Sequence, residues 1–281
     1  LDHLQFTPAR TLVNRLAKKS LSAIGDSCWH CHSGVGAFPL QVATRFKIPL
    51  LVWGESIAEN DGRASYKRPE HKFDRDYFTK VSARLTAAEM VGGDLSEKDL
   101  HPFELPSYEE IENTGVWGLH LGDYLFWDDE RQTEWIRDVY GWRETEMEGA
   151  YKGYKSAECV MAGMHDFTCY LKRGFGRSTW QASVDVRNGL LTRQEGFALV
   201  RHHDQERPQA LDYYLKITGL TEAEFYETMK QKKHEALKNI ELPVHPKAKP
   251  NAERLVPFVE QIIQKHLHQP DPRIVRDEEE R

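Results

Sequence analysis

The sequence lacks any apolar stretch that approaches the roughly 18 to 20 residues needed to cross a bilayer. It also lacks the charged and then apolar N-terminal segment that is typical of a secretory signal. These two absences predict a cytoplasmic protein without a membrane span. No internal repeat or low-complexity tract occurs in the 281 residues, of which 40 % are hydrophobic, so the chain can bury a sizeable core.

Cysteine and excess positive charge are also scarce. Four cysteines in a chain of this length are too few for a disulfide framework, and the C-x-x-C spacing of two of them favours a metal or redox site. A formal net charge of −6 excludes general nucleic-acid binding, which needs clustered Lys and Arg. The Gly92-Gly93 pair is not a phosphate loop, because no buried strand precedes it.

The first part of the chain alternates between strand and helix patterns. Apolar residues recur at helical spacing from Pro8 to Ile24, and Gly25 ends the run. Residues 4–8 read as the end of a strand, and Ile48–Trp53 as a buried strand after a second helix. The alternation predicts an α/β fold with a parallel sheet covered on both faces, to which residues 1–56 contribute. One or two βα units cannot close a stable sheet, so we expect the chain to begin in mid-domain.

Helical patterns dominate farther along the chain. Thr192 with Glu195 and Thr221 with Glu224 have the spacing of capping boxes, in which a hydroxyl and a carboxylate satisfy the first amides of a helix. The expected segments are a long loop with a helical insertion at 57–100, a mainly helical substrate or partner region at 101–268, and a polar tail at 269–281.

The segment Cys28-Trp29-His30-Cys31-His32 places two thiols at the start of a predicted helix. Two cysteines at this spacing can share one metal ion or iron–sulfur cluster, and the helix N-terminus lowers the pKa of a thiol. Two ligands do not complete a site, so Cys159, Cys169 or His32 would have to contribute. The alternative is a pair of unliganded core cysteines.

Glu55 follows Gly54 at the end of the predicted strand. Ligands of open α/β sheets bind outside the carboxyl ends of strands, so this pair is a candidate for contact with a nucleotide, a metal ion or an attacking amine. The alternative role of Glu55 is to cap the next turn. The aromatic and acidic residues 122–128 suit a sugar site, although core packing and helix capping are the favoured interpretation there.

A basic, glycine-containing stretch at 170–188 is the best anion-binding candidate, because glycine allows close backbone approach and Arg matches phosphate geometry. Its cations are Lys172, Arg173, Arg177 and Arg187. The alternative is a solvated face. His165 and Asp166 form a candidate acid–base pair, with a structural role as the alternative.

Several ordered segments together resemble the N-acetyl sugar amidotransferase family of the PP-loop ATP pyrophosphatases, which acts in surface-polysaccharide biosynthesis. They are GDSCWHCHSGV, KIPLLVWGES, LGDYLFWDD, GWRE and YLKRGFGRSTWQASVDVRNGLLTRQE, within about residues 4 to 210. The resemblance implies a Rossmann-like, nucleotide-binding α/β domain of the adenine nucleotide α-hydrolase (PP-loop) type, with residues 1–56 as its C-terminal part, followed by a mainly helical region. It also implies conversion of a sugar acetamido group to an acetamidino group in lipopolysaccharide, O-antigen or related glycan biosynthesis.

In the implied reaction, ATP with Mg²⁺ adenylates the amide oxygen of a nucleotide-linked or related N-acetyl sugar, and ammonia displaces AMP. Glutaminase and cyclase-like subunits would supply the ammonia. The family's SGGxDS pyrophosphate loop is absent from this sequence, so we expect a fragment that is inactive alone.

The same resemblance aligns Cys28 and Cys31 with a pair that holds an iron–sulfur cluster in related tRNA thiolases. A sulfur transferase is therefore the alternative enzyme. A third possibility is a non-catalytic interaction module stapled by a metal such as zinc at the cysteines.

Overall fold

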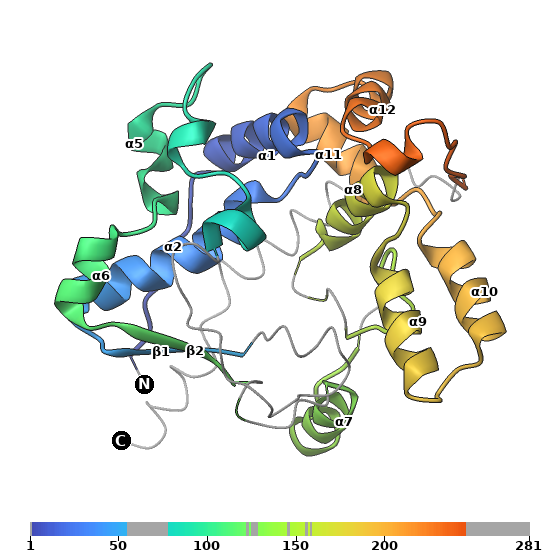
Figure 1. Ribbon diagram of the computed structural model, residues 1–281, viewed down its shortest axis with the longest axis horizontal. Helices are drawn as coiled ribbons and strands as arrows, with labels where there is room; N and C mark the ends of the chain where they lie inside the picture. The colour runs from blue at the N-terminus through green and yellow to red at the C-terminus, as the bar shows by residue number, and fades with distance from the viewer. Residues whose placement is uncertain are drawn as a thin grey trace.

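The computed structural model of the chain is mostly helical, with one small sheet (Figure 1). It describes residues 2–54, 78–121, 124, 129–144, 147–154, 157 and 159–245. The α-helices are α1 (Arg10–Ile24), α2 (Trp29–Phe46), α5 (Glu97–Leu100), α6 (Tyr108–Thr114), α7 (Asp129–Tyr140), α8 (Ala162–Arg173), α9 (Arg177–Arg187), α10 (Arg193–His203), α11 (Ala210–Thr218) and α12 (Glu222–Gln231). Short helical turns are η1 (Phe78–Ala83), η2 (Ala88–Met90), η3 (His101–Phe103) and η5 (Glu235–Leu237).

The sheet consists of β1 (Leu50–Trp53) and β2 (Trp117–His120), which pair in parallel from Leu50 opposite Trp117 to Trp53 opposite His120. The parallel pairing agrees with the predicted class, but the described residues contain no Rossmann core. The prediction that β1 is buried is wrong, since Leu50 and Val52 are 49 % and 52 % exposed. Only one face of the strand packs, with Leu51 and Trp53 against Leu40 of α2.

The predicted strand end at residues 4–8 is also wrong, because this segment has no regular structure. Its Phe6 ring stacks on Phe38 of α2 at a centroid distance of 5.3 Å and meets the edge of Phe103 at 6.5 Å. Aromatic packing on a helix therefore holds this segment in place of strand pairing.

The predicted helix before Gly25 is confirmed. α1 buries Leu12, Leu16 and Leu21, and Gly25 ends it in the left-handed conformation at φ 64°. The Gly25 amide donates to the Leu21 carbonyl at 2.8 Å, which is a common helix ending. A Cβ atom at this position would also lie 2.8 Å from Cβ of Lys232, so only glycine fits here.

α1 joins two apolar cores. Ala17 and Leu21 pack with α8, α11 and α12 around Phe167, Tyr214 and Phe225, and the Tyr214 hydroxyl donates to the Ala17 carbonyl at 2.9 Å. The second core also includes residues of α1, together with the start of α2 and the segment from η1 to η3. That core contains Leu12, Leu16, Trp29, Ala83, Ala87, Met90, Leu95, Leu100 and Phe103.

Capping boxes start four of the described helices. The two predicted ones are confirmed at Thr192 of α10 and Thr221 of α12, each with its hydroxyl and carboxylate bonds in place. Ser96 and Ser107 open α5 and α6 in the same way. Within the described residues, no helix has both the length and the apolar character that a membrane span requires.

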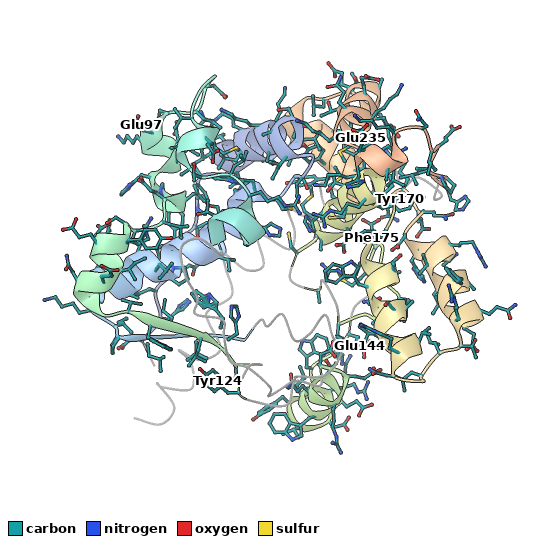
Figure 2. All side chains as sticks on the ribbon, viewed as in Figure 1. Glu97, Tyr124, Glu144, Tyr170, Phe175 and Glu235 are labelled. Carbon is teal, nitrogen blue, oxygen red and sulfur yellow. The ribbon has the colours of Figure 1, made fainter. Side chains whose placement is uncertain are left out.

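Tyr170, labelled in Figure 2, provides a test of the α8 core under alkaline conditions. Its buried hydroxyl donates to the Pro243 carbonyl at 2.7 Å, and burial raises its pKa to about 12. Unfolded tyrosine ionises near pH 10. The unfolded state therefore loses this proton first, so the contribution of Tyr170 to stability is lost as the pH rises from about 10 to 12.

Tyr170→Phe is expected to lower the free energy of unfolding by about 1 kcal/mol at neutral pH and to weaken its decline above pH 10. Urea unfolding at a series of pH values measures both effects. Tyr140→Phe is the control, because Tyr140 is 72 % exposed. An unchanged alkaline slope in Tyr170→Phe would contradict the prediction.

Candidate functional site

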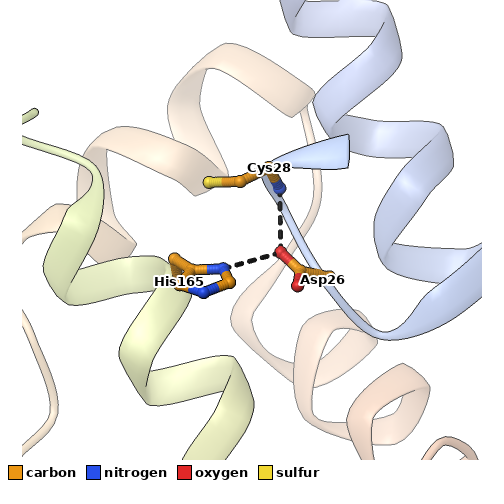
Figure 3. A group of neighbouring side chains, drawn as sticks. All are labelled: Asp26, Cys28 and His165. Carbon is orange, nitrogen blue, oxygen red and sulfur yellow. Dashed lines mark hydrogen bonds and ion pairs between the residues drawn. The ribbon is translucent and has the colours of Figure 1, made fainter. Parts of the chain in front are cut away.

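Three side chains capable of binding metal meet where the turn between α1 and α2 contacts α8 (Figure 3). Asp26 and Cys28 come from the turn, and His165 comes from α8. The Asp26 Oδ1 atom accepts a hydrogen bond from His165 Nδ1 at 2.9 Å and another from the Cys28 amide at 3.0 Å. One ligand atom from each residue lies within 4.8 Å of the other two. The cluster is thus compact and is assembled from distant parts of the chain.

The turn that carries Asp26 and Cys28 is fixed from both sides. The Gly25 cap directs the chain out of α1, and the buried Ser20 hydroxyl donates to the Asp26 carbonyl at 2.7 Å. Trp29, fully buried at the start of α2, donates from Nε1 to the Leu85 carbonyl at 2.9 Å. These bonds hold the turn that carries Asp26 and Cys28, and none of them involves α8.

The electrostatics of the cluster favour an ion pair at neutral pH. Burial opposes charge on Asp26, but the attraction and hydrogen bond of His165 overcome it and hold the pKa of this carboxyl well below its usual value. Burial likewise opposes charge on His165, but Asp26 raises the pKa of this imidazole well above about 6.5. A low-polarity site therefore keeps a carboxylate and an imidazolium together.

Two further histidines beside this pair remain neutral. Burial and then the charge of His165 lower the pKa of His32 to about 4, and burial and then His32 lower the pKa of His30 to about 4. The rings of His32 and His165 have their centroids 5.0 Å apart. On the opposite side of His165, the Cys169 Sγ atom lies 3.9 Å from Nε2.

The four cysteines proposed as metal ligands occupy different environments. Cys28 belongs to the cluster, and Cys169 contacts the other ring nitrogen of His165. Cys31 and Cys159 are exposed and are not members of the three-residue group. No disulfide joins any of the four. Sequence reasoning missed Asp26. Its position two residues before Cys28 could have drawn attention to it.

The donor set fits a single metal ion better than a cluster. Iron–sulfur clusters are held mainly by cysteine thiolates, whereas this group offers one carboxylate oxygen, one thiol sulfur and one imidazole nitrogen. Zinc accepts all three ligand types in one tetrahedral site. The structure therefore contains a candidate metal site at Asp26, Cys28 and His165.

The comparison with known families concerns the part of the chain that contains His165. Residues 148–247 match the family model of the WbpG-like LPS biosynthesis protein, C-terminal domain. No match was found among curated proteins. The WbpG-like domain includes α8 to α12, so the candidate metal site joins this domain, through His165, to the turn that precedes α2.

The basic residues predicted to bind an anion are dispersed within the WbpG-like domain. Lys172 is buried and donates from Nζ to the carbonyls of Ile24 and Gly25 at 3.0 and 3.1 Å, so it caps the end of α1. Arg173 is the last residue of α8. Arg177 and Arg187 are the first and last residues of α9, about 15 Å apart along the helix. Their proposed contact with phosphate remains a prediction.

Lys172→Met separates the capping role from a role in ligand binding. Loss of two charge-assisted bonds to buried carbonyls is expected to lower the free energy of unfolding by about 1 to 2 kcal/mol without any ligand present. Urea unfolding of the ligand-free chain measures this loss. Lys216→Met on exposed α11 surface is the control, and an equal effect of the two variants would exclude the capping role.

The N-terminus of α9 already holds an anion from the same chain. The buried Asp204 carboxylate accepts bonds from the amides of Gly176, Ser178 and Thr179 at 2.8, 2.9 and 3.1 Å, and from the Thr179 hydroxyl. A Cβ atom at Gly176 would lie 2.8 Å from Asp204 Oδ1, which explains the glycine. The glycine-containing basic stretch of the WbpG-like domain thus binds an internal carboxylate.

The two members of the predicted acid–base pair face different partners. His165 pairs with Asp26, whereas Asp166 pairs with Arg177 across an N–O distance of 3.2 Å. Gly54 is exposed directly after β1. Glu55 and most of the 122–128 segment lie outside the described residues.

Proposed function

We propose that this chain acts in LPS biosynthesis as part of an ATP-dependent sugar amidotransferase. The observation that carries the proposal is the match of residues 148–247 to the C-terminal domain of WbpG-like LPS biosynthesis proteins. The ordered motifs between residues 4 and 210 that resemble N-acetyl sugar amidotransferases support it independently. The substrate is a nucleotide-linked or related N-acetyl sugar.

The proposed reaction replaces the oxygen of an acetamido group by nitrogen. The amide oxygen attacks the α-phosphorus of ATP and pyrophosphate leaves. Ammonia then adds to the activated carbon, and AMP departs with the former amide oxygen. An amide is a poor electrophile, so adenylation is needed to turn its oxygen into a leaving group. Mg²⁺ would stabilise the charge on the departing pyrophosphate.

The proposed binding groups come from two parts of the chain. Arg173 and Arg177 follow one another across the α8–α9 turn and are the proposed contacts for phosphate or for the acceptor. Gly54, at the carboxyl end of β1, and Glu55 after it are the proposed contacts for the nucleotide. We propose glutaminase and cyclase-like subunits as the source of ammonia. A Rossmann-like adenine nucleotide α-hydrolase domain, of which β1 and α2 would be part, remains the proposed setting of the ATP site.

The test uses the complete protein that the gene encodes, because this sequence contains no SGGxDS motif. It is incubated with ATP, Mg²⁺, ammonium and a panel of UDP-linked acetamido sugars whose carbonyl oxygen carries a heavy isotope. The expected result is an acetamidino sugar by mass spectrometry, with the heavy oxygen transferred to AMP. Release of ADP, or heavy oxygen in phosphate, would overturn the adenylation step.

A second arm distinguishes the sulfur-transferase alternative. Anaerobically purified protein is analysed for iron and acid-labile sulfide. The amidotransferase proposal expects amidine formation without either. Iron and sulfide together with sulfur transfer to RNA would replace it by the alternative.

A further inference from the structure

The cluster of Asp26, Cys28 and His165 combines three different donor types in a small, largely buried volume (Figure 3). Asp26 is 4 % exposed, and Cys28 and His165 are half-buried. Carboxylate oxygen, thiol sulfur and imidazole nitrogen are all zinc ligands, and one atom of each kind lies within 4.8 Å of the other two here. The cluster is therefore a candidate for a dedicated ligand.

The spacing of the three ligand atoms suits a metal ion of zinc's size. Zinc binds sulfur at about 2.3 Å and nitrogen or oxygen at about 2.0 to 2.2 Å, so ligand atoms in a tetrahedral site are about 3.5 Å apart. The three atoms already lie within 4.8 Å of one another, and the closest pair, Asp26 Oδ1 and His165 Nδ1, is 2.9 Å apart.

Surrounding groups are placed to orient these ligands. The Cys28 amide donates to Asp26 Oδ1 at 3.0 Å, and the Ser27 hydroxyl lies 3.4 Å from the Cys28 sulfur. The second nitrogen of His165 faces Cys169 at 3.9 Å. Such contacts fix the orientation of metal ligands and tune their affinity.

We propose that Asp26, Cys28 and His165 hold one mononuclear zinc ion, which binds the turn between α1 and α2 to α8. The ion would lie between the three side chains and bind the carboxylate, sulfur and imidazole nitrogen directly. This assignment differs from the C-x-x-C interpretation, because Cys31 is not a ligand. It also does not depend on the amidotransferase proposal, since it concerns the joining of two segments of the fold.

The experiment uses the full chain, with Zn²⁺ and Co²⁺ as probes. Metal-free protein is titrated with Zn²⁺ in competition with a chromogenic chelator, and with Co²⁺ under anaerobic conditions. The expected results are one zinc per chain and a sulfur-to-cobalt charge-transfer band. Zinc should also raise the thermal unfolding temperature, because it binds the folded state.

The variants are Cys28→Ser, Asp26→Asn and His165→Gln, with Cys31→Ser as the matched control in the same motif. Each of the three variants should weaken zinc binding by more than about 10-fold, which is the smallest loss expected when a group that orients a metal ligand is removed. Cys28→Ser should also abolish the charge-transfer band. Cys31→Ser should keep both the affinity and the band. Circular dichroism of the metal-free variants verifies that they fold.

Three outcomes would overturn the assignment. The first is equal loss of zinc binding in Cys31→Ser and Cys28→Ser, which would restore the C-x-x-C site. The second is unchanged zinc affinity in folded Asp26→Asn and His165→Gln. The third is a chain that binds no zinc, or one that holds iron and sulfide in its place.

Discussion

His165→Ala is expected to lower the free energy of unfolding of the metal-free chain by about 3 to 5 kcal/mol at neutral pH. Its imidazole is the charged partner of a carboxylate that is 4 % exposed. Without His165, Asp26 would remain buried with only the Cys28 amide among the bonds that the structure gives its side chain. An uncompensated buried charge is among the few changes that have effects of this size.

Variants of Asp26 distinguish the loss of the ion pair from the loss of side-chain packing. In Asp26→Asn, His165 can release its proton and become neutral, so the cost should be smaller than in His165→Ala. The double variant Asp26→Ala/His165→Ala should cost less than the sum of the two alanine variants, because the removed groups interact.

His101→Ala provides the exposed control. His101 contacts Glu104 at 3.4 Å, but both side chains are 63 % exposed. Exposed pairs of this kind contribute about 0 to 1 kcal/mol. Urea unfolding followed by circular dichroism measures the free energy of unfolding of these variants and of the unsubstituted chain. A loss of less than 1 kcal/mol in His165→Ala would contradict a buried ion pair.

Asp204→Ala should have the second largest effect, with a loss of about 3 to 4 kcal/mol in the free energy of unfolding. The carboxylate of Asp204 caps three amides and one hydroxyl at the start of α9, of which the Gly176 and Ser178 amides are buried and the Thr179 amide and hydroxyl are partly buried. Alanine would leave these donors without their acceptor. Asp204 is 4 % exposed, and this burial raises the pKa of its carboxyl even though the four donors favour its charged form.

Glu195→Ala is the matched control for this cap. Glu195 also closes a helix start, through the Thr192 amide and hydroxyl, but the bonds of this capping box are exposed to solvent. Its loss should lower the free energy of unfolding much less than the loss of Asp204 does. Asp204→Asn keeps the shape and one acceptor oxygen, so its loss in the free energy of unfolding should lie between those of Asp204→Ala and Glu195→Ala. Equal urea midpoints for Asp204→Ala and Glu195→Ala would show that burial adds nothing to the Asp204 cap.

Local signals in the sequence were sufficient for the helices. The helix that ends at Gly25 and the capping boxes at Thr192 and Thr221 depend on residues within a few positions of one another, and the structure confirms them. The strand predictions were less reliable. Whether Leu50 and Val52 are covered depends on what packs against β1, and the neighbouring β2 segment, Trp117–His120, is too short to stand out in the sequence.

The site required contacts that the sequence does not reveal. The C-x-x-C spacing drew attention to Cys28, but the closest charged partner of Asp26 is His165, 139 positions farther along the chain. Similarly, glycine and arginine indicated an anion site near Gly176, yet the anion is supplied by Asp204, 28 positions away. The spacing of residues in the sequence can identify a metal-binding or charged group, but tertiary packing determines which residue it contacts.

The packing of α1 against α8, α11 and α12 has a consequence for how the molecule can be divided. The family match begins at residue 148, yet Ala17 and Leu21 of α1 belong to the same apolar core as Phe167 and Phe225, and Lys172 closes the end of α1. A polypeptide that began at residue 148 would lack α1 and would expose the apolar surface that α1 covers. Either α1 or another apolar segment must therefore accompany residues 148–247 for this core to stay closed to water.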